Sequence, residues 1–497
     1  MKMKYQWRIL PFLSMLLLLN SCEKEAGADE GGKTDEKEIV LPAKEFRAAW
    51  IATVGNIDWP SNVAKGNVEQ MKSEYIAYLD LFKKANLNAV VFQIRPTADA
   101  FYPSTLEPWS QWLTGVQGGN PGFDVLRFAI DEAHKRGLQL HAWMNPFRIA
   151  NTLTPSLHSS HIIHQKPAWK MAYGGKLYFN PGIPECREFF FKVIDELLAN
   201  YNVDGIHFDD YFYPYPVSGE AMPDQVTFET YNPNGIKNIA DWRRENVNMV
   251  VKGVYERVMA KPGVVFGVSP FPTWRHKSVD PTGSQTSGTA CYDDLYADTK
   301  KWCDEGWIHY ICPQLYGSTE NASIKFSELL MWWSKNAAKA ELLIGMPMYK
   351  FGVPAEGAIF QSVSEFTKEF SLCRMIPEYK GNIQYNATAF TKNLVGITDE
   401  LNKLNSGSVL RPALRKSGAL PATVTLRSEN GTLRWNESAN IQCYAVYKFI
   451  VEGDKKVGTL ITTVKELSFA GERGAEYGVT AISSFDEESV ISNLVTL

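Results

Sequence analysis

The segment VDGIHFDDYFYP (residues 203–214) begins as an apolar strand and ends in two adjacent carboxylates. Because side chains alternate along a strand, Ile206 and Phe208 share one face, and His207 and Asp209 share the other. The pattern predicts that the apolar face packs against helices and that Asp209 points to the opposite side. Unpaired carboxylates are costly to desolvate, so two of them at the end of a buried strand indicate a functional site.

Seven further segments are short and apolar in the same way, and amphipathic helical stretches lie between them. The eight predicted strands are FRAAWIATV from Phe46, NAVVFQIRP from Asn88, LQLHAWMNP from Leu138, VDGIHFDDY from Val203, VVFGVSPFP from Val264, WIHYICPQLY from Trp307, LLIGMPMYK from Leu342 and GNIQYNA from Gly381. A strand followed by a helix, eight times, predicts an α/β fold, a (β/α)8 TIM barrel over residues 44–410. The active site of such a barrel lies at the C-terminal ends of its strands.

From about Ser417 the chain changes to short alternating strands separated by Asn-Gly, Gly-Asp and Gly-Glu turns. Residues 417–497 are therefore predicted to form a small all-β sandwich, similar to an immunoglobulin-like fibronectin type III module. Trp435 and Tyr444 are its expected core aromatics. We expect a spacer or a packing partner, and carbohydrate binding is the alternative role.

The first 22 residues read as a bacterial lipoprotein signal peptide. Basic residues precede an apolar run over residues 9–19 that is too short for a stable membrane span. The run ends in Leu-Asn-Ser-Cys, which resembles a lipobox, so Cys22 is the expected lipidation site. Residues 23–43 are predicted to be a flexible acidic tether. We expect a lipid-anchored protein of the cell envelope, held at the outer membrane. The sequence does not distinguish the periplasmic face of that membrane from the cell surface.

Composition narrows the classes of function. The net charge is −4 and no basic run occurs, which argues against a nucleic-acid partner. Fourteen Trp and 22 Tyr residues suit the binding of sugar rings. The six cysteines besides Cys22 form no CxxC pair, so we expect no zinc site. Phosphate-loop, dinucleotide, nucleophile-elbow and HExxH motifs are absent, and we expect no metal, no other cofactor and no particular protein partner.

The candidate catalytic residues are four acids. Asp209 and Asp210 form an adjacent pair, for which a salt bridge, helix capping or metal ligation is the alternative reading. Asp99 and Glu107 follow the second strand, and either could supply the second carboxylate that glycoside hydrolysis needs. Arg95 either pairs with Asp99 or contacts substrate.

Other polar and aromatic residues fall at the predicted strand exits or in the loops that follow them. They would line a cleft for a polysaccharide. The predicted substrate-binding residues are Trp50, Arg95, Trp109, Asn145, Arg148, Asn180, Tyr211, Trp274, Arg275, Gln314 and Tyr316.

Seven motifs occur in one order: FRAAWIATVGNIDWP, FQIRPTADAFYPSTLEPWSQWLTG, HAWMNPFR, YFNPG, DGIHFDDYFYP, GVSPFPTWR and PQLYG. Together they resemble the glycosyl hydrolase-like 10 family of bacterial envelope proteins. The resemblance implies hydrolysis of peptidoglycan glycan strands that lack stem peptides. In related barrel glycosidases a Gly-apolar-Arg-x-Asp strand carries the nucleophile, and residues 205–209 fit except that His207 replaces Arg. Tyr211 stands where a chitinase has its acid, which disfavours that mechanism. The alternative function is a noncatalytic glycan-binding lipoprotein.

Overall fold

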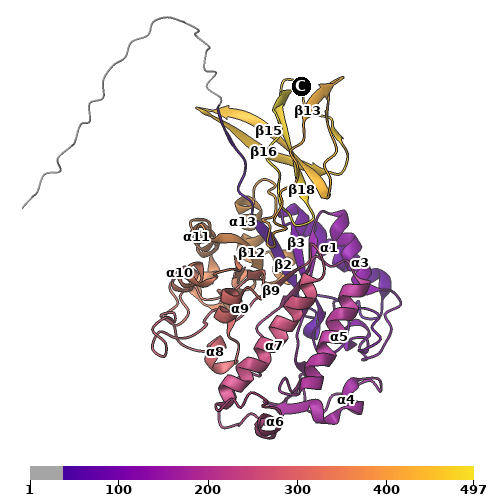
Figure 1. The fold of residues 1–497 in the computed structure, drawn as a ribbon, viewed down its shortest axis with the longest axis vertical. Coiled ribbons are helices and arrows are strands. Elements are labelled where there is room, and N and C mark those ends of the chain that lie inside the picture. The colour runs from indigo at the N-terminus through magenta and orange to yellow at the C-terminus, as the bar shows by residue number, and fades with distance from the viewer. Residues whose placement is uncertain (1–36) are drawn as a thin grey trace, which may run out of the picture.

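The computed structural model describes residues 37–497. The predicted signal peptide, the lipidation site at Cys22 and most of the predicted tether lie outside these residues. Within them the chain forms a barrel with a smaller β domain on one end (Figure 1).

Eight parallel strands close into a barrel in the order in which they occur in the sequence. They are β2 (Phe46–Ile51), β3 (Ala89–Arg95), β4 (Gln139–Met144), β8 (Gly205–Phe208), β9 (Val265–Val268), β10 (Tyr310–Ile311), β11 (Glu341–Met346) and β12 (Tyr379–Gln384). The last strand pairs with the first, with Ile383 beside Ala48. Each of the eight predicted segments overlaps one of these strands, so the predicted barrel is confirmed.

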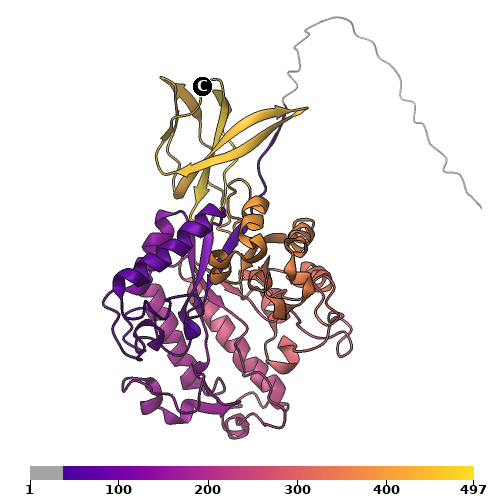
Figure 2. The same cartoon turned by 180° about the vertical axis from the view of Figure 1, so that it is seen from behind.

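One principal helix follows each barrel strand and covers the outside of the barrel (Figures 1 and 2). These helices are α1 (Val68–Lys84), α3 (Val125–Lys135), α5 (Pro184–Asn200), α7 (Ile239–Met259), α9 (Thr299–Glu305), α10 (Phe326–Asn336), α11 (Val363–Arg374) and α13 (Ile397–Leu404). Helix α1 illustrates how the sequence specifies these helices. The Asn67 side chain caps its first turn, and Met71, Tyr75 and Leu79 are buried at helical spacing.

The loops carry the remaining elements of the barrel domain. After β4, a three-stranded antiparallel sheet forms from β5 (Arg148–Ala150), β7 (Lys176–Phe179) and β6 (Lys170–Tyr173). The short helices are α2 (Gln111–Thr114), α4 (Ile162–Gln165), α6 (Gln225–Thr230), α8 (Cys291–Asp294) and α12 (Ala387–Lys392). Helices α4 and α6 lie at the end of the barrel away from the β domain (Figures 1 and 2).

Polar and aromatic side chains fill the inside of the barrel. His207 is fully buried; its Nδ1 lies 2.8 Å from the Tyr310 hydroxyl, and its Nε2 accepts from Trp50 Nε1 at 3.2 Å. The Tyr310 hydroxyl also lies 2.9 Å from His141 Nδ1, so that histidine is a satisfied interior residue. Ile206 and Phe208 belong instead to the core between strands and helices. The predicted assignment of the two faces of β8 is therefore confirmed.

Two sheets form the C-terminal domain. The larger has the order β1 (Glu38–Val40), β16 (Lys455–Val464), β15 (Ile441–Glu452), β18 (Glu476–Ser483) and β19 (Val495–Thr496). The smaller contains β13 (Leu426–Glu429), β14 (Thr432–Trp435) and β17 (Ser468–Phe469). The Trp435 and Tyr444 rings lie 5.6 Å apart in the core between them, which confirms the sandwich and its core aromatics.

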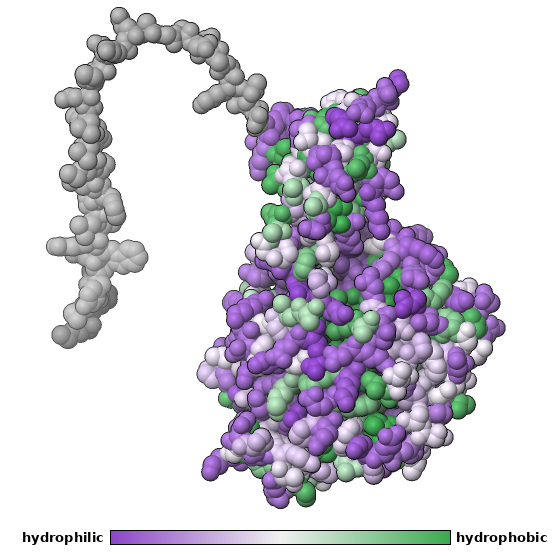
Figure 3. All heavy atoms as spheres, turned by 45° about the vertical axis from the view of Figure 1, so that its right-hand side comes forward, coloured by the Kyte–Doolittle hydropathy of each residue, from purple (hydrophilic) through white to green (hydrophobic). Residues whose placement is uncertain are grey.

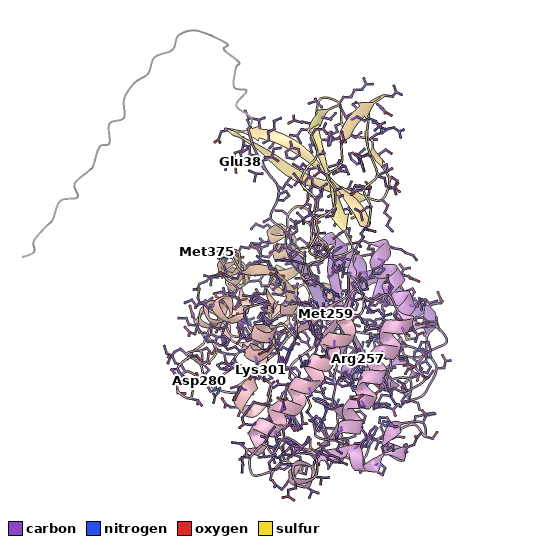
Figure 4. All side chains as sticks on the ribbon, in the orientation of Figure 1. Glu38, Arg257, Met259, Asp280, Lys301 and Met375 are labelled. Atoms are coloured by element: carbon purple, nitrogen blue, oxygen red, sulfur yellow. The ribbon has the colours of Figure 1, made fainter. Side chains whose placement is uncertain are left out.

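The predicted tether is too long at its C-terminal end. Residues 38–40 are not a flexible tether but strand β1, which pairs in parallel with β16, and Glu38 forms an ion pair with Lys455 at 3.0 Å. Without β1, strand β16 would be an edge strand with unpaired backbone groups. Residues 38–40 pair with these groups and extend the sheet by one strand. Glu38 lies on the sandwich in Figure 4.

The sandwich is attached to the N-terminal ends of the barrel strands. Arg411 donates to Asp486 at 2.8 Å, and Gln139, the first residue of β4, donates to the same carboxylate at 2.8 Å. Arg415 donates to the carbonyls of Lys261 and Val264, just before β9. The sandwich therefore lies opposite the strand ends where the chemistry of this fold is expected.

Four further features of residues 37–497 concern membrane spans, metal sites, cysteines and the surface. No helix in this range is long and apolar enough to cross a membrane. In the same range no cluster of His, Cys, Asp and Glu has the composition of a metal site. Six cysteines are free thiols, and all but Cys443 are buried. On the face shown in Figure 3, hydrophilic and hydrophobic residues are interspersed.

Candidate active site

Asp209 follows directly after β8 and lies at the C-terminal mouth of the barrel. Its side chain is held by two N–H donors: Trp143 Nε1 is 3.0 Å from Oδ2, and the Tyr211 backbone N is 3.0 Å from Oδ1. Only 3 % of the residue is exposed. Strand β4 supplies the tryptophan, so two neighbouring strands fix the position of this carboxylate.

Asp210 turns into the mouth of the barrel beside Asp209. Its Oδ2 accepts from the Tyr215 hydroxyl at 2.6 Å, and the nearby Gln314 side chain lowers its pKa. Gln314 donates from Nε2 to the Ser269 carbonyl at 2.9 Å. We call Asp209 and Asp210 the carboxylate pair.

The pair is electrostatically coupled. Burial raises the pKa of Asp209 well above its ordinary value, and the neighbouring charge of Asp210 raises it further. Burial also raises the pKa of Asp210, against the hydrogen bond from Tyr215. Two neighbouring buried carboxyls cannot both ionise cheaply, so the pair retains one proton to a higher pH than an isolated carboxyl would. This is the protonation state that acid-assisted bond cleavage requires.

One wall of the site combines arginine and tyrosines. The Arg148 guanidinium carbon lies 3.6 Å from the centre of the Tyr211 ring, which stacks on Tyr215 at 5.5 Å. Arg148 is 5 % exposed, and its Nε has no partner among residues 37–497. Its charge lowers the pKa of Asp209. Arg148 and Tyr211 thus lie where the sequence predicted contacts with substrate.

The opposite wall consists of Tyr316, Tyr349 and Tyr385, which we call the tyrosine wall. Their ring centres are 5.5 to 6.1 Å apart. Within the described chain their hydroxyls make no hydrogen bond, so they are available to a ligand. Trp50 packs beneath this wall, 6.0 Å from Tyr385. It is 2 % exposed and bonded to His207, so it supports the cleft floor and is not the predicted substrate platform.

Glu107 is not a second catalytic carboxylate. Arg95 donates to both of its oxygens, from Nε at 2.7 Å and from a terminal nitrogen at 2.5 Å. The Arg95 side chain is 0 % exposed and that of Glu107 1 %. Arg95 also donates to the carbonyls of Asn145 and Pro146. Both predicted roles, catalysis by Glu107 and substrate binding by Arg95, are therefore wrong, because each side chain is fully used inside the fold.

Asp99 is also held away from the carboxylate pair. It is fully buried, with contacts to Thr97 at 3.3 Å and Gln117 at 3.4 Å, and burial raises its pKa to about 7. It neither pairs with Arg95 nor reaches the mouth, so its predicted catalytic role is not supported.

Asn145 and Asn180 act within the protein. Asn145 is fully buried, accepts from Trp143 Nε1 at 3.0 Å, and so positions the tryptophan that holds Asp209. Asn180 donates to Thr227 at 2.8 Å and shapes its loop by accepting from Gly182. Neither amide is free for the predicted substrate contact.

Trp274 and Arg275 belong to the packing of the β9 loop. Trp274 donates to Asp298 at 3.0 Å and stacks on Trp332, and Arg275 is paired with Asp293 and Asp280. Their polar groups are bonded within the loop, so the structure gives no support to their predicted role in substrate binding. Trp109 is half-buried in the β3 loop, and its role stays a prediction.

Four residues of the site were missed by the sequence analysis: Trp143, Tyr215, Tyr349 and Tyr385. Trp143 shares the interior face of β4 with His141, a periodicity that could have revealed it. Tyr385 follows β12 directly, in the position that defines the mouth of such a barrel. Tyr215 gave no signal beyond membership of a Tyr- and Pro-rich loop.

A closed (β/α)8 barrel with coupled carboxyls at the C-terminal mouth defines the class of glycoside hydrolase-like barrels. The sequence model of the family described as Glycosyl hydrolase-like 10 matches residues 45–359, and the chain belongs to this family. It is 46 % identical over 366 residues to "Glycosyl hydrolase YngK" of Bacillus subtilis, which covers 72 % of this chain and 71 % of the relative.

A second relative is "Glycosyl hydrolase DigH" of Escherichia coli K12, at 34 % identity over 408 residues, 76 % of this chain and 92 % of the relative. Among solved structures, the PgaB (BpsB) glycoside hydrolase domain from Bordetella bronchiseptica aligns with a TM-score of 0.49 at 11 % identity, covering 73 % of this chain and 99 % of that one.

Proposed function

We propose that this protein is a glycoside hydrolase that cleaves a polysaccharide of the bacterial envelope, namely peptidoglycan glycan strands without stem peptides. The observation that carries the proposal is the carboxylate pair at the end of β8, buried and coupled so that it retains one proton. The relatives named as glycosyl hydrolases support the reaction class. The substrate rests on the resemblance of the seven sequence motifs.

The donors around the pair suggest how the two roles divide. Asp209 receives two N–H groups and lies near the Arg148 charge, an environment that stabilises negative charge. It would stabilise or attack the anomeric carbon as positive charge develops there. The pair shares one proton, and Asp210 would donate it to the glycosidic oxygen, which becomes the leaving hydroxyl.

The walls of the site suit an extended sugar chain. Arg148 and Tyr211 present a flat cationic and aromatic surface on one side, and the tyrosine wall offers rings and free hydroxyls on the other. Sugar rings pack their apolar faces on aromatics and bond through their hydroxyls.

We further propose that Cys22 is lipidated and anchors the protein to the outer membrane. The described chain enters through β1 on the sandwich, at the end of the barrel opposite the carboxylate pair. In this arrangement the sandwich acts as a spacer, and the active site faces away from the membrane toward the glycan. Radiolabelled palmitate incorporation, lost in Cys22→Ser, tests the anchor.

The test of the reaction is incubation of the soluble protein with denuded glycan strands, followed by measurement of new reducing ends and product sizes. We expect Asp209→Asn to lower kcat by at least about 10³-fold without lowering the melting temperature, because the residue lies at a strand end and its charge is not needed for folding. Asp195→Asn, on the exposed side of α5, is the matched control. Saturable binding without new reducing ends would favour the noncatalytic alternative, and near-normal cleavage by Asp209→Asn would refute its assignment.

A further inference from the structure

A second cavity lies at the C-terminal face of the barrel, where the loops after β11 and β12 meet. It has a volume of about 250 Å³. Its lining residues are Ile57, Met348, Tyr349, Phe351, Val353, Asn386, Thr388, Ala389, Lys392, Leu394 and Ile397. We call it the distal pocket. Nothing in the proposed chemistry uses it.

The distal pocket continues the tyrosine wall. Tyr349 belongs to both, and its ring lies 5.5 Å from Tyr385 and 5.8 Å from Tyr316. The Tyr349 backbone N also donates to the Tyr385 carbonyl at 2.8 Å, which couples the two loops. Besides burial, the charge of Asp210 raises the pKa of Tyr316, and that of Asp209 raises the pKa of Tyr385, so both tyrosines lie near the carboxylate pair. A sugar chain that passes over the wall therefore reaches the pocket.

One polar group in the pocket lacks a partner. Asn386 is 7 % exposed and lines the cavity, yet within residues 37–497 its side-chain amide makes no hydrogen bond. Its amide atoms remain accessible from the cavity, where a ligand can bond them. An amide that both donates and accepts matches another amide in a ligand.

The wall of the pocket is held in a strained shape. Val395 has φ of 49°, in the left-handed region that β-branched residues avoid, and Asn393 has φ of 42°. Asn393 keeps the turn by accepting from the Thr398 backbone N at 2.8 Å. Leu394 stays 38 % exposed beside Gly352, where a Cβ would lie 2.5 Å from the leucine. Backbone strain of this kind persists only where the surrounding contacts enforce it, and it is often found at ligand sites.

We infer that the distal pocket binds one N-acetylated sugar ring of the glycan, away from the bond that is cleaved. This inference rests on the proposed function and specifies its substrate. Pockets for drug-sized ligands have volumes of roughly 300–1,000 Å³. The distal pocket is slightly smaller, which suits a ligand the size of one sugar ring. The methyl of an acetamido group fits against Phe351 and Leu394, and its amide pairs with Asn386.

The test is calorimetric titration of catalytically inactive Asp209→Asn protein with a β-1,4-linked N-acetylglucosamine pentamer and with cellopentaose, which has the same linkage but no acetamido groups. We expect at least about 10-fold tighter binding of the acetylated pentamer. Ala389→Leu, which fills the pocket, should reduce this preference to less than about 3-fold, and Asn386→Ala should weaken only the acetylated ligand. Met375→Ala, an exposed residue near the sandwich end of the barrel (Figure 4), is the control.

Equal binding of the two pentamers, or a preference unchanged in both pocket variants, overturns the inference. Melting curves show whether each variant folds, and either variant alone suffices for the comparison. Because the assay measures binding, a preference that depends on Asn386 stands even if the wild-type protein produces no new reducing ends. That outcome would reject the hydrolase proposal alone.

Discussion

Replacing Glu107 with Gln separates a structural acid from a catalytic one. The substitution removes the charge opposite Arg95, whose side chain is 0 % exposed. Breaking a buried pair by removing one partner costs about 3–5 kcal/mol, because the remaining charge is uncompensated. A native protein has about 5–15 kcal/mol of total stability, so a large fraction would be lost. The Arg95 guanidinium also lies 5.1 Å from the Phe190 ring, an apolar environment that cannot hydrate it.

Urea unfolding followed by tryptophan fluorescence measures this loss, with Glu69→Gln as the control. Glu69 is 88 % exposed at its side chain and 3.7 Å from Lys72, so its loss should cost no more than about 0.5 kcal/mol. Below its unfolding transition, Glu107→Gln should keep most of its activity on glycan strands. A variant as stable as wild type but inactive would refute the structural assignment and restore Glu107 as a catalytic candidate.

Three other substitutions test separate parts of the structure. Tyr215→Phe removes a bond that lowers the pKa of Asp210, so the alkaline limb of kcat/KM should move to higher pH and kcat should fall about 10-fold. Burial raises the pKa of Glu369, whose oxygens have no partner within residues 37–497, so its folded state binds the extra proton and stability falls as pH rises above about 4.5. Glu369→Met should add about 1–3 kcal/mol at pH 7 and flatten this decline in urea unfolding at pH 5 and pH 8. Gly267→Ala would place a Cβ 2.0 Å from the Tyr310 ring, and its unfolding free energy should drop by about 1–3 kcal/mol; a loss below 0.5 kcal/mol would contradict the packing.

The barrel could be predicted from the sequence because its physical signals are local. Each strand is a short apolar run, and the alternation in β8 assigns Phe208 to the helix layer and Asp209 to the mouth. Position after a strand also predicts position at the mouth, which is why Asp210, Arg148 and Gln314 were found. These inferences need only the period of a strand and the polarity of the fold.

The loop partners could not be predicted, because they depend on how a long connection closes. Asp99 and Glu107 both follow β3, and spacing alone gives Arg95 no preference between them. The structure brings the more distant acid back, since Ala100 bridges Trp109 and folds the loop onto itself. Arg275 likewise finds its partner 18 residues away, at Asp293. A position at or after a strand end is therefore not sufficient for a catalytic role.

What separates the proposed catalytic acids from Glu107 is how their charge is compensated. Glu107 has a bidentate arginine. Within residues 37–497, neither member of the carboxylate pair has a cationic partner within ion-pair distance; each faces the other and a few neutral donors. A buried carboxylate pair without a cationic partner destabilises the folded protein when both groups are ionised, so it has no structural advantage. It is retained where a proton must be held near a bond and released during reaction, which is why the pair carries the functional proposal.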